Sequence, residues 1–124
     1  MRGPGTVVVV EDDVSMSQAM ERILRLGGLA PVAFASGEEA SASPVTREAA
    51  CLVIDLQLPG MNGFALRERL AAAGALPPVI FISAFDEPEA RAQAARLGTT
   101  FLPKPFSGRA LLEAIRKSTA VSAK

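Results

Sequence analysis

The chain has 124 residues, the size of one globular domain, of which 49% are hydrophobic and 21% charged. The 13 basic and 13 acidic side chains cancel, which argues against a nucleic-acid binder that depends on bulk positive charge. The absence of histidine excludes a histidine base, metal ligand or phosphate carrier. The single cysteine, Cys51, excludes an internal disulfide and a structural zinc site.

No apolar stretch approaches the roughly 20 residues that a membrane span requires. The first apolar run, four valines before Glu11, is too short for the core of a signal peptide. We therefore expect a soluble protein of the cytoplasm, where thiols stay reduced.

Short apolar runs alternate along the chain with segments of helical period. The runs predict five strands, at 6–10, 31–35, 51–54, 78–82 and 100–102. The periodic segments predict five helices: 15–26, a short one after Ser36 that Ser43-Pro44 interrupts, 63–73, one capped by Asp86 that runs to 97, and a last one capped by Ser107.

This alternation predicts a doubly wound α/β fold, with a five-stranded parallel sheet covered by the five helices on both faces. The first, third and fourth strands are apolar throughout, as burial on both faces demands. We expect one domain over residues 1–118, followed at 119–124 by a polar tail or the start of a linker.

Polar side chains stand where four of these strands end. Glu11 and Asp12 follow the first strand, Asp55 the third, Ser83 the fourth and Lys104 the fifth. Ligands of open parallel sheets bind at the carboxyl ends of the strands. With the strand order 2-1-3-4-5, these four ends would lie side by side and form one small pocket.

Each feature alone has a simpler explanation: a solvated acidic loop, a turn aspartate, an exposed lysine or a helix-capping serine. Together they are complementary, because clustered carboxylates repel one another unless a cation such as Mg²⁺ binds between them. Lys104 and Ser83 could then contact the oxygens of a phosphoryl group. Asp55, at the centre, could act as the nucleophile and form an acyl phosphate.

Four motifs carry a family resemblance: VVEDD at 9–13, IDLQLPGMNG at 54–63, ISA at 82–84 and FLPKPF at 101–106. In this order and spacing the chain resembles, over about residues 6–117, the receiver domain of two-component response regulators of the chemotaxis-regulator type. The resemblance implies the flavodoxin-like version of the predicted fold. The last motif is similar to that of the nitrogen-fixation regulator subgroup.

The resemblance implies that Asp55 is the phosphoacceptor and that Mg²⁺, with Mn²⁺ as an alternative, is the cofactor. Glu11, Asp12, Asp55 and the backbone carbonyl of Gln57 match the metal ligands, although many members have Asp where Glu11 stands. Lys104 matches the phosphate-binding lysine.

The resemblance also assigns a switch. Ser83 matches the switch hydroxyl, where Thr is commoner, and Phe101 the switch aromatic, where Tyr is common. Ala84, Phe85 and Gln57 match residues that flank the phosphoryl group. A cis peptide bond is expected before Pro105.

The implied partners are a histidine kinase or a histidine phosphotransfer protein, and a downstream protein or the chain's own output domain. The output partner would contact the face formed by the fourth helix, the fifth strand and the fifth helix, through which phosphorylated receivers often form homodimers. No direct contact with nucleic acid or a membrane is expected. The chemistry is that of a switch that phosphorylates and dephosphorylates itself, not of an enzyme with a separate substrate.

Three other functions stay open. The chain could be the receiver part of a longer DNA-binding transcriptional regulator. It could be an interaction module that has lost phosphorylation, although such domains typically lack the residues that Asp55 and Lys104 match. It could be a Mg²⁺-dependent phosphatase of the haloacid dehalogenase type, but those enzymes carry a general-acid Asp where Gln57 stands here.

Overall fold

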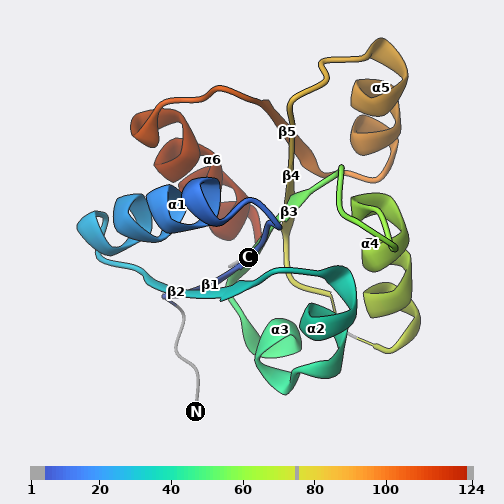
Figure 1. Cartoon of the computed structure of the whole chain (residues 1–124), viewed down its shortest axis with the longest axis horizontal. Coiled ribbons are helices and arrows are strands. Elements are labelled where there is room, and N and C mark those ends of the chain that lie inside the picture. Colours follow the sequence, from blue (N-terminus) through green and yellow to red (C-terminus); the bar gives the residue numbers. More distant parts are fainter. Residues whose placement is uncertain (1–4, 75, 123–124) are drawn as a thin grey trace.

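The computed structural model describes residues 5–74 and 76–122, and its centre is one parallel sheet (Figure 1). The strand order β2-β1-β3-β4-β5 confirms the predicted topology. The strands are β1 (Thr6–Val10), β2 (Ala30–Phe34), β3 (Cys51–Asp55), β4 (Val79–Ser83) and β5 (Thr100–Pro103).

The described residues form six helices, one more than predicted. They are α1 (Val14–Leu26), α2 (Gly37–Ala42), α3 (Pro44–Glu48), α4 (Gly63–Ala72), α5 (Pro88–Arg96) and α6 (Gly108–Ser122). The extra helix arises at Ser43, where Pro44 interrupts α2 as predicted but then occupies the first turn of α3, a position that needs no N–H donor. In the described part of the chain, none of these helices is long and apolar enough to cross a membrane.

Two hydrophobic layers enclose the sheet. Alternate residues of β1 point to opposite faces, so Val7 and Val9 pack with α1 and α6, whereas Val8 and Val10 pack with α2, α3, α4 and α5. Figure 1 shows these two groups of helices on opposite sides of the strands. Burial on both faces explains why β1, β3 and β4 are apolar along nearly their whole length.

Most of the predicted helix caps are present. The hydroxyls of Ser36 and Ser107 accept N–H groups of the first turns of α2 and α6. The predicted cap at Asp86 is wrong. The helix α5 begins after Glu87, which makes no side-chain cap, and the Asp86 carboxylate binds the Arg91 guanidinium instead.

The last helix is longer than the sequence pattern suggests. It continues to Ser122, through most of the segment for which a polar tail or linker is predicted. Residues 123–124 of that segment lie outside the described residues.

The register of the sheet aligns the strand ends. Val10 pairs with Ile54, Asp55 with Ile82, and Ser83 with Pro103. The residues that end or follow these strands therefore lie along one edge of the sheet, as predicted.

Candidate functional site

Three carboxylates meet at the carboxyl edge of the sheet. Each of Glu11, Asp12 and Asp55 offers an oxygen within 4.8 Å of the others. Glu11 and Asp55 are only 2% and 3% exposed, whereas Asp12 is exposed. The cluster thus combines a buried pair of acids with one acid that faces solvent.

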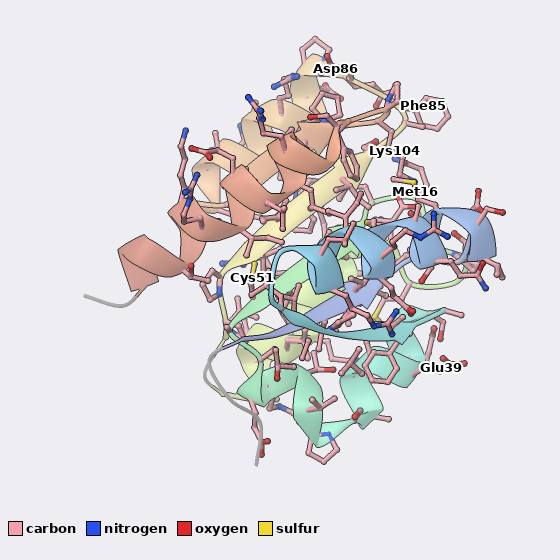
Figure 2. All side chains as sticks on the ribbon, turned by 90° about the vertical axis from the view of Figure 1, so that its left-hand side faces the viewer. Met16, Glu39, Cys51, Phe85, Asp86 and Lys104 are labelled. Carbon is pink, nitrogen blue, oxygen red and sulfur yellow. The ribbon has the colours of Figure 1, made fainter. Side chains whose placement is uncertain are left out.

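Lys104 joins the two buried acids. Its Nζ donates to Glu11 Oε1 at 2.8 Å and to Asp55 Oδ2 at 3.0 Å. The Lys104 backbone N–H donates to the Ser83 carbonyl at 2.7 Å, and the following Lys104–Pro105 bond is cis, as expected. Figure 2 shows Lys104 and Phe85 at one end of the molecule and Cys51, which begins β3, toward the other.

Backbone groups hold the remaining oxygens of the buried pair. The Gln57 N–H donates to Asp55 Oδ1 at 2.9 Å, and the Asp13 N–H donates to Glu11 Oε2 at 3.1 Å. Every oxygen of these two carboxylates therefore accepts a hydrogen bond, so both side chains are fixed in orientation.

Burial and the neighbouring charges act in opposite directions on the pKa values of Glu11 and Lys104. Burial raises the pKa of the Glu11 carboxyl above its ordinary value, against the lowering effect of the Lys104 hydrogen bond. Burial acts to lower the pKa of Lys104, but the hydrogen bonds and charges of Glu11 and Asp55 outweigh it, so this pKa is raised. Lys104 is therefore positively charged at neutral pH.

The donor set fits a metal ion. Three carboxylates face a single ammonium group, which leaves an excess of negative charge within a few ångströms. An all-oxygen set of this kind suits a hard divalent cation, which would relieve the repulsion between the acids. The acidic cluster can thus bind a metal ion, in agreement with the prediction from the strand ends.

Ser83 is completely buried, and its hydroxyl is bound to two neighbouring loops. The hydroxyl lies 2.9 Å from Gln57 Oε1 and 3.0 Å from the Phe85 carbonyl, two acceptors for one proton. It also accepts the Phe85 N–H at 3.0 Å. Ala84 and Phe85 themselves are exposed beside the site.

Phe101 lies on the edge strand β5 and is half-buried. The Arg91 guanidinium covers its ring at 4.9 Å from the centroid and also binds Asp86. The sequence pattern did not single out Arg91, because only the fold brings α5 over β5.

Gly63 lets the loop after Asp55 pack closely against α4, a role that the sequence motif did not reveal. A Cβ there would stand 2.8 Å from the Asp55 carbonyl oxygen and 3.0 Å from Leu56 Cα. Both atoms belong to the backbone, so a larger residue at this position would push the loop after Asp55 away from α4. The adjacent Asn62, whose side chain caps α4, is the one local signal for this junction.

Residues 7–116 match the family of response regulator receiver domains. The chain belongs to this family. Receiver domains are a signalling family of two-component systems and not a family of conventional enzymes.

Among curated proteins, this receiver domain is 37% identical over 114 residues to nodulation protein W of Bradyrhizobium diazoefficiens, a match that covers 91% of the chain and 50% of that protein. It is 35% identical over 103 residues to the DNA-binding transcriptional regulator NtrC of Salmonella typhimurium, covering 82% of the chain and 22% of NtrC. The chain thus spans half or less of the length of these relatives.

Solved structures agree with the fold. A response regulator receiver protein from Burkholderia phymatum is 38% identical with a TM-score of 0.78, and the match covers 93% of this chain and 94% of that one. The receiver domain of the Francisella response regulator 1452 is 26% identical with a TM-score of 0.86, covering 95% of this chain and 98% of that one.

Proposed function

We propose that this receiver domain accepts a phosphoryl group on Asp55 from the phosphohistidine of a histidine kinase or a histidine phosphotransfer protein. The observation that carries the proposal is the position of Asp55. Its buried carboxylate is held between Lys104 and a backbone N–H, beside two further carboxylates.

The transfer needs only one bond to form and one to break. A carboxylate oxygen of Asp55 attacks phosphorus, the P–N bond of the phosphohistidine breaks, and its electron pair stays on the imidazole nitrogen. Lys104, already 3.0 Å from Asp55, can follow the new negative charge and bind a phosphoryl oxygen.

Glu11, Asp12, Asp55 and the backbone carbonyl of Gln57 would hold Mg²⁺, or Mn²⁺ in its place. When bound, the cation supplies positive charge that offsets the carboxylates and the incoming phosphoryl oxygens. One oxygen of Glu11 already accepts a hydrogen bond from Lys104, so Glu11 would bind the cation through a water molecule.

Ser83 and Phe101 would transmit the phosphorylation of Asp55 to the surface of the domain. The Ser83 hydroxyl must exchange Gln57 and Phe85 for a phosphoryl oxygen, which would release the loop that Phe85 begins. Ala84, Phe85 and Gln57 would flank the phosphoryl group. The face formed by α5, β5 and α6, which includes Phe101, would then bind a downstream protein, an output domain or a second phosphorylated copy.

The direct test is the intact mass of the protein after incubation with acetyl phosphate, with and without Mg²⁺. We expect one added phosphoryl group that requires Mg²⁺ and is absent from Asp55→Asn. The Asp86→Asn variant, which alters an exposed acid outside the cluster, is the control and should still be labelled. Labelling of Asp55→Asn to the same extent would refute the proposal.

A role as the receiver part of a longer DNA-binding regulator is the second candidate. It is supported by the identity to NtrC, of which the matched segment is 22%. An antiserum raised against this chain would detect a markedly larger native protein in cell extract if this is correct. A native protein of 12.9 kDa would exclude it.

A further inference from the structure

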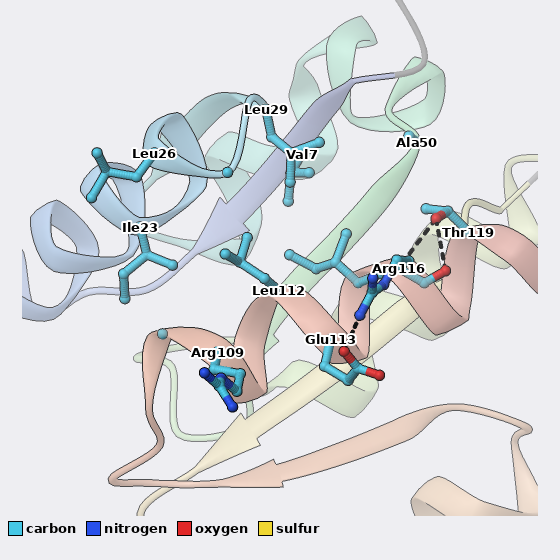
Figure 3. Close-up of a pocket in the computed structure, with 13 residues that line it drawn as sticks. Val7, Ile23, Leu26, Leu29, Ala50, Arg109, Leu112, Glu113, Arg116 and Thr119 are labelled. Carbon is cyan, nitrogen blue, oxygen red and sulfur yellow. Dashed lines mark hydrogen bonds and ion pairs between the residues drawn. The ribbon is translucent and has the colours of Figure 1, made fainter.

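A concave apolar surface runs between α1 and α6, and we call it the α1–α6 groove. It encloses about 740 Å³ and is lined by the apolar side chains of Val7, Ile23, Leu26, Leu29, Leu112 and Ile115 (Figure 3). Leu26 is 82% exposed at its rim, one of three large hydrophobic residues that the described chain leaves in solvent. Burial of these side chains by a partner would be favourable.

The groove is separate from the phosphoacceptor site. Its lining includes Val7 in the first half of β1 and Ala50 just before β3, so it extends toward the amino edge of the sheet. Asp55 and Lys104 lie at the opposite, carboxyl edge. A partner in the groove would therefore leave the carboxylates accessible.

The margins of the groove are basic. Arg109 and Arg116 line it from α6, and Leu26 also borders a hollow lined by Arg22 and Arg25 of α1. Glu113 binds Arg116 and Glu21 binds Arg25, so both local acids are already paired. Among the described residues, Arg22 and Arg109 have no ion-pair partner. The face is thus positively charged on a chain whose net charge is zero.

We propose that the α1–α6 groove binds an amphipathic helix of a partner protein, with apolar side chains on one face and acidic residues beside them. An amphipathic helix binds by laying the apolar side chains at i, i+3, i+4 and i+7 into a hydrophobic groove of its receptor. The unpaired Arg22 and Arg109 select acidic flanks. A second copy of this chain fits poorly, because a symmetric contact would bring the same arginines together. A flat lipid surface would leave the hollow unfilled.

The test uses a fluorescent synthetic helical peptide with leucines at i, i+3, i+4 and i+7 and glutamates at the flanking positions. Its matched control carries lysines in place of the glutamates. We expect saturable binding of the acidic peptide by fluorescence anisotropy and at least tenfold weaker binding of the basic one. Equal binding of both peptides, or none of the acidic one, would overturn the proposal.

Two double variants with reversed charges test whether the peptide binds in the α1–α6 groove. The double variant Arg22→Glu and Arg109→Glu should bind the acidic peptide at least tenfold more weakly and now prefer the basic peptide. The double variant Arg69→Glu and Arg96→Glu makes the same charge change at exposed positions of α4 and α5 and should bind as the unaltered protein does. An equal loss in both variants would contradict a groove-specific contact.

Leu26→Gln removes an apolar side chain from the rim of the groove without adding a charge, and because Leu26 is 82% exposed the fold is not at risk. We expect a tenfold or greater loss of affinity for the acidic peptide. Sedimentation of the protein alone, and co-sedimentation with anionic lipid vesicles, check the other occupants. A dimer abolished by Leu26→Gln, or vesicle binding that the peptide does not compete away, would replace the proposed helix.

Discussion

The central and edge strands of the sheet differ in burial and in what they contribute. All residues of β1, β3 and β4 are buried, whereas those of β5 are half-buried and β2 is partly exposed. The central strands supply Asp55 and Ser83 and lead directly to Glu11. The edge strand β5 supplies Phe101 and leads to Lys104. The Asp55 carboxylate and the Ser83 hydroxyl are thus anchored in the core, whereas Phe101 and Lys104 come from or follow a less buried edge strand.

Truncation of Phe81 and of Phe101 is the sharpest test of this difference in burial. The two residues are register partners on β4 and β5. Phe81 is fully buried and packs against Phe64 at a ring distance of 4.7 Å. We expect Phe81→Ala to lower the free energy of unfolding by about 3–5 kcal/mol. The same truncation at Phe101 should cost about 1 kcal/mol, because its ring is half-exposed already. Equal losses in urea denaturation would contradict the comparison.

Removal of the Lys104 side chain should have the next largest effect on the free energy of unfolding. Lys104→Met leaves the buried carboxylates of Glu11 and Asp55 without their cation, so we expect a loss of about 3 kcal/mol in metal-free buffer. Mg²⁺ should restore more stability to this variant than to the unaltered protein. Lys117→Met, at an exposed position of α6, is the control. A melting temperature of Lys104→Met that does not respond to Mg²⁺ would count against the acidic cluster as a metal site.

Gly63→Ala should lower the free energy of unfolding by less, but it should also disturb the loop next to Asp55. The added Cβ would meet the Asp55 carbonyl oxygen and Leu56 Cα, which are backbone atoms that cannot turn away. We expect a loss of about 1–3 kcal/mol in the free energy of unfolding, together with slower phosphorylation. Gly5→Ala, where an added Cβ meets no atom within 4 Å, should leave both quantities unchanged. An unaffected Gly63→Ala would show that the loop after Asp55 is free to adjust.

The sequence predicted where the central strands lie and which residues of the site stand at their ends. Unbroken apolar runs that stop at polar residues locate β1, β3 and β4, and the predicted strand order brings Glu11, Asp55 and Lys104 to one edge. Each strand is readable because it is a local run of apolar residues, and the meeting of the strand ends then follows from the strand order of an open parallel sheet.

The features that sequence reasoning missed depend on contacts between distant or competing partners. Asp86 could cap a helix or bind a cation, and the structure pairs it with Arg91. The bond from Lys104 to Glu11 joins residues 93 positions apart, so no local pattern reveals it. The split between α2 and α3 depends on Pro44, which can end one helix or begin the next.

The central claim is that Asp55, rather than another acid of the cluster, carries the phosphoryl group. Reduction of the phosphorylated protein with borohydride converts an aspartyl phosphate to homoserine, which peptide mass mapping then locates. We predict homoserine at position 55 alone, and only when Mg²⁺ was present during phosphorylation. Reduction at position 12 or 11 while Asp55 stays intact would contradict the account.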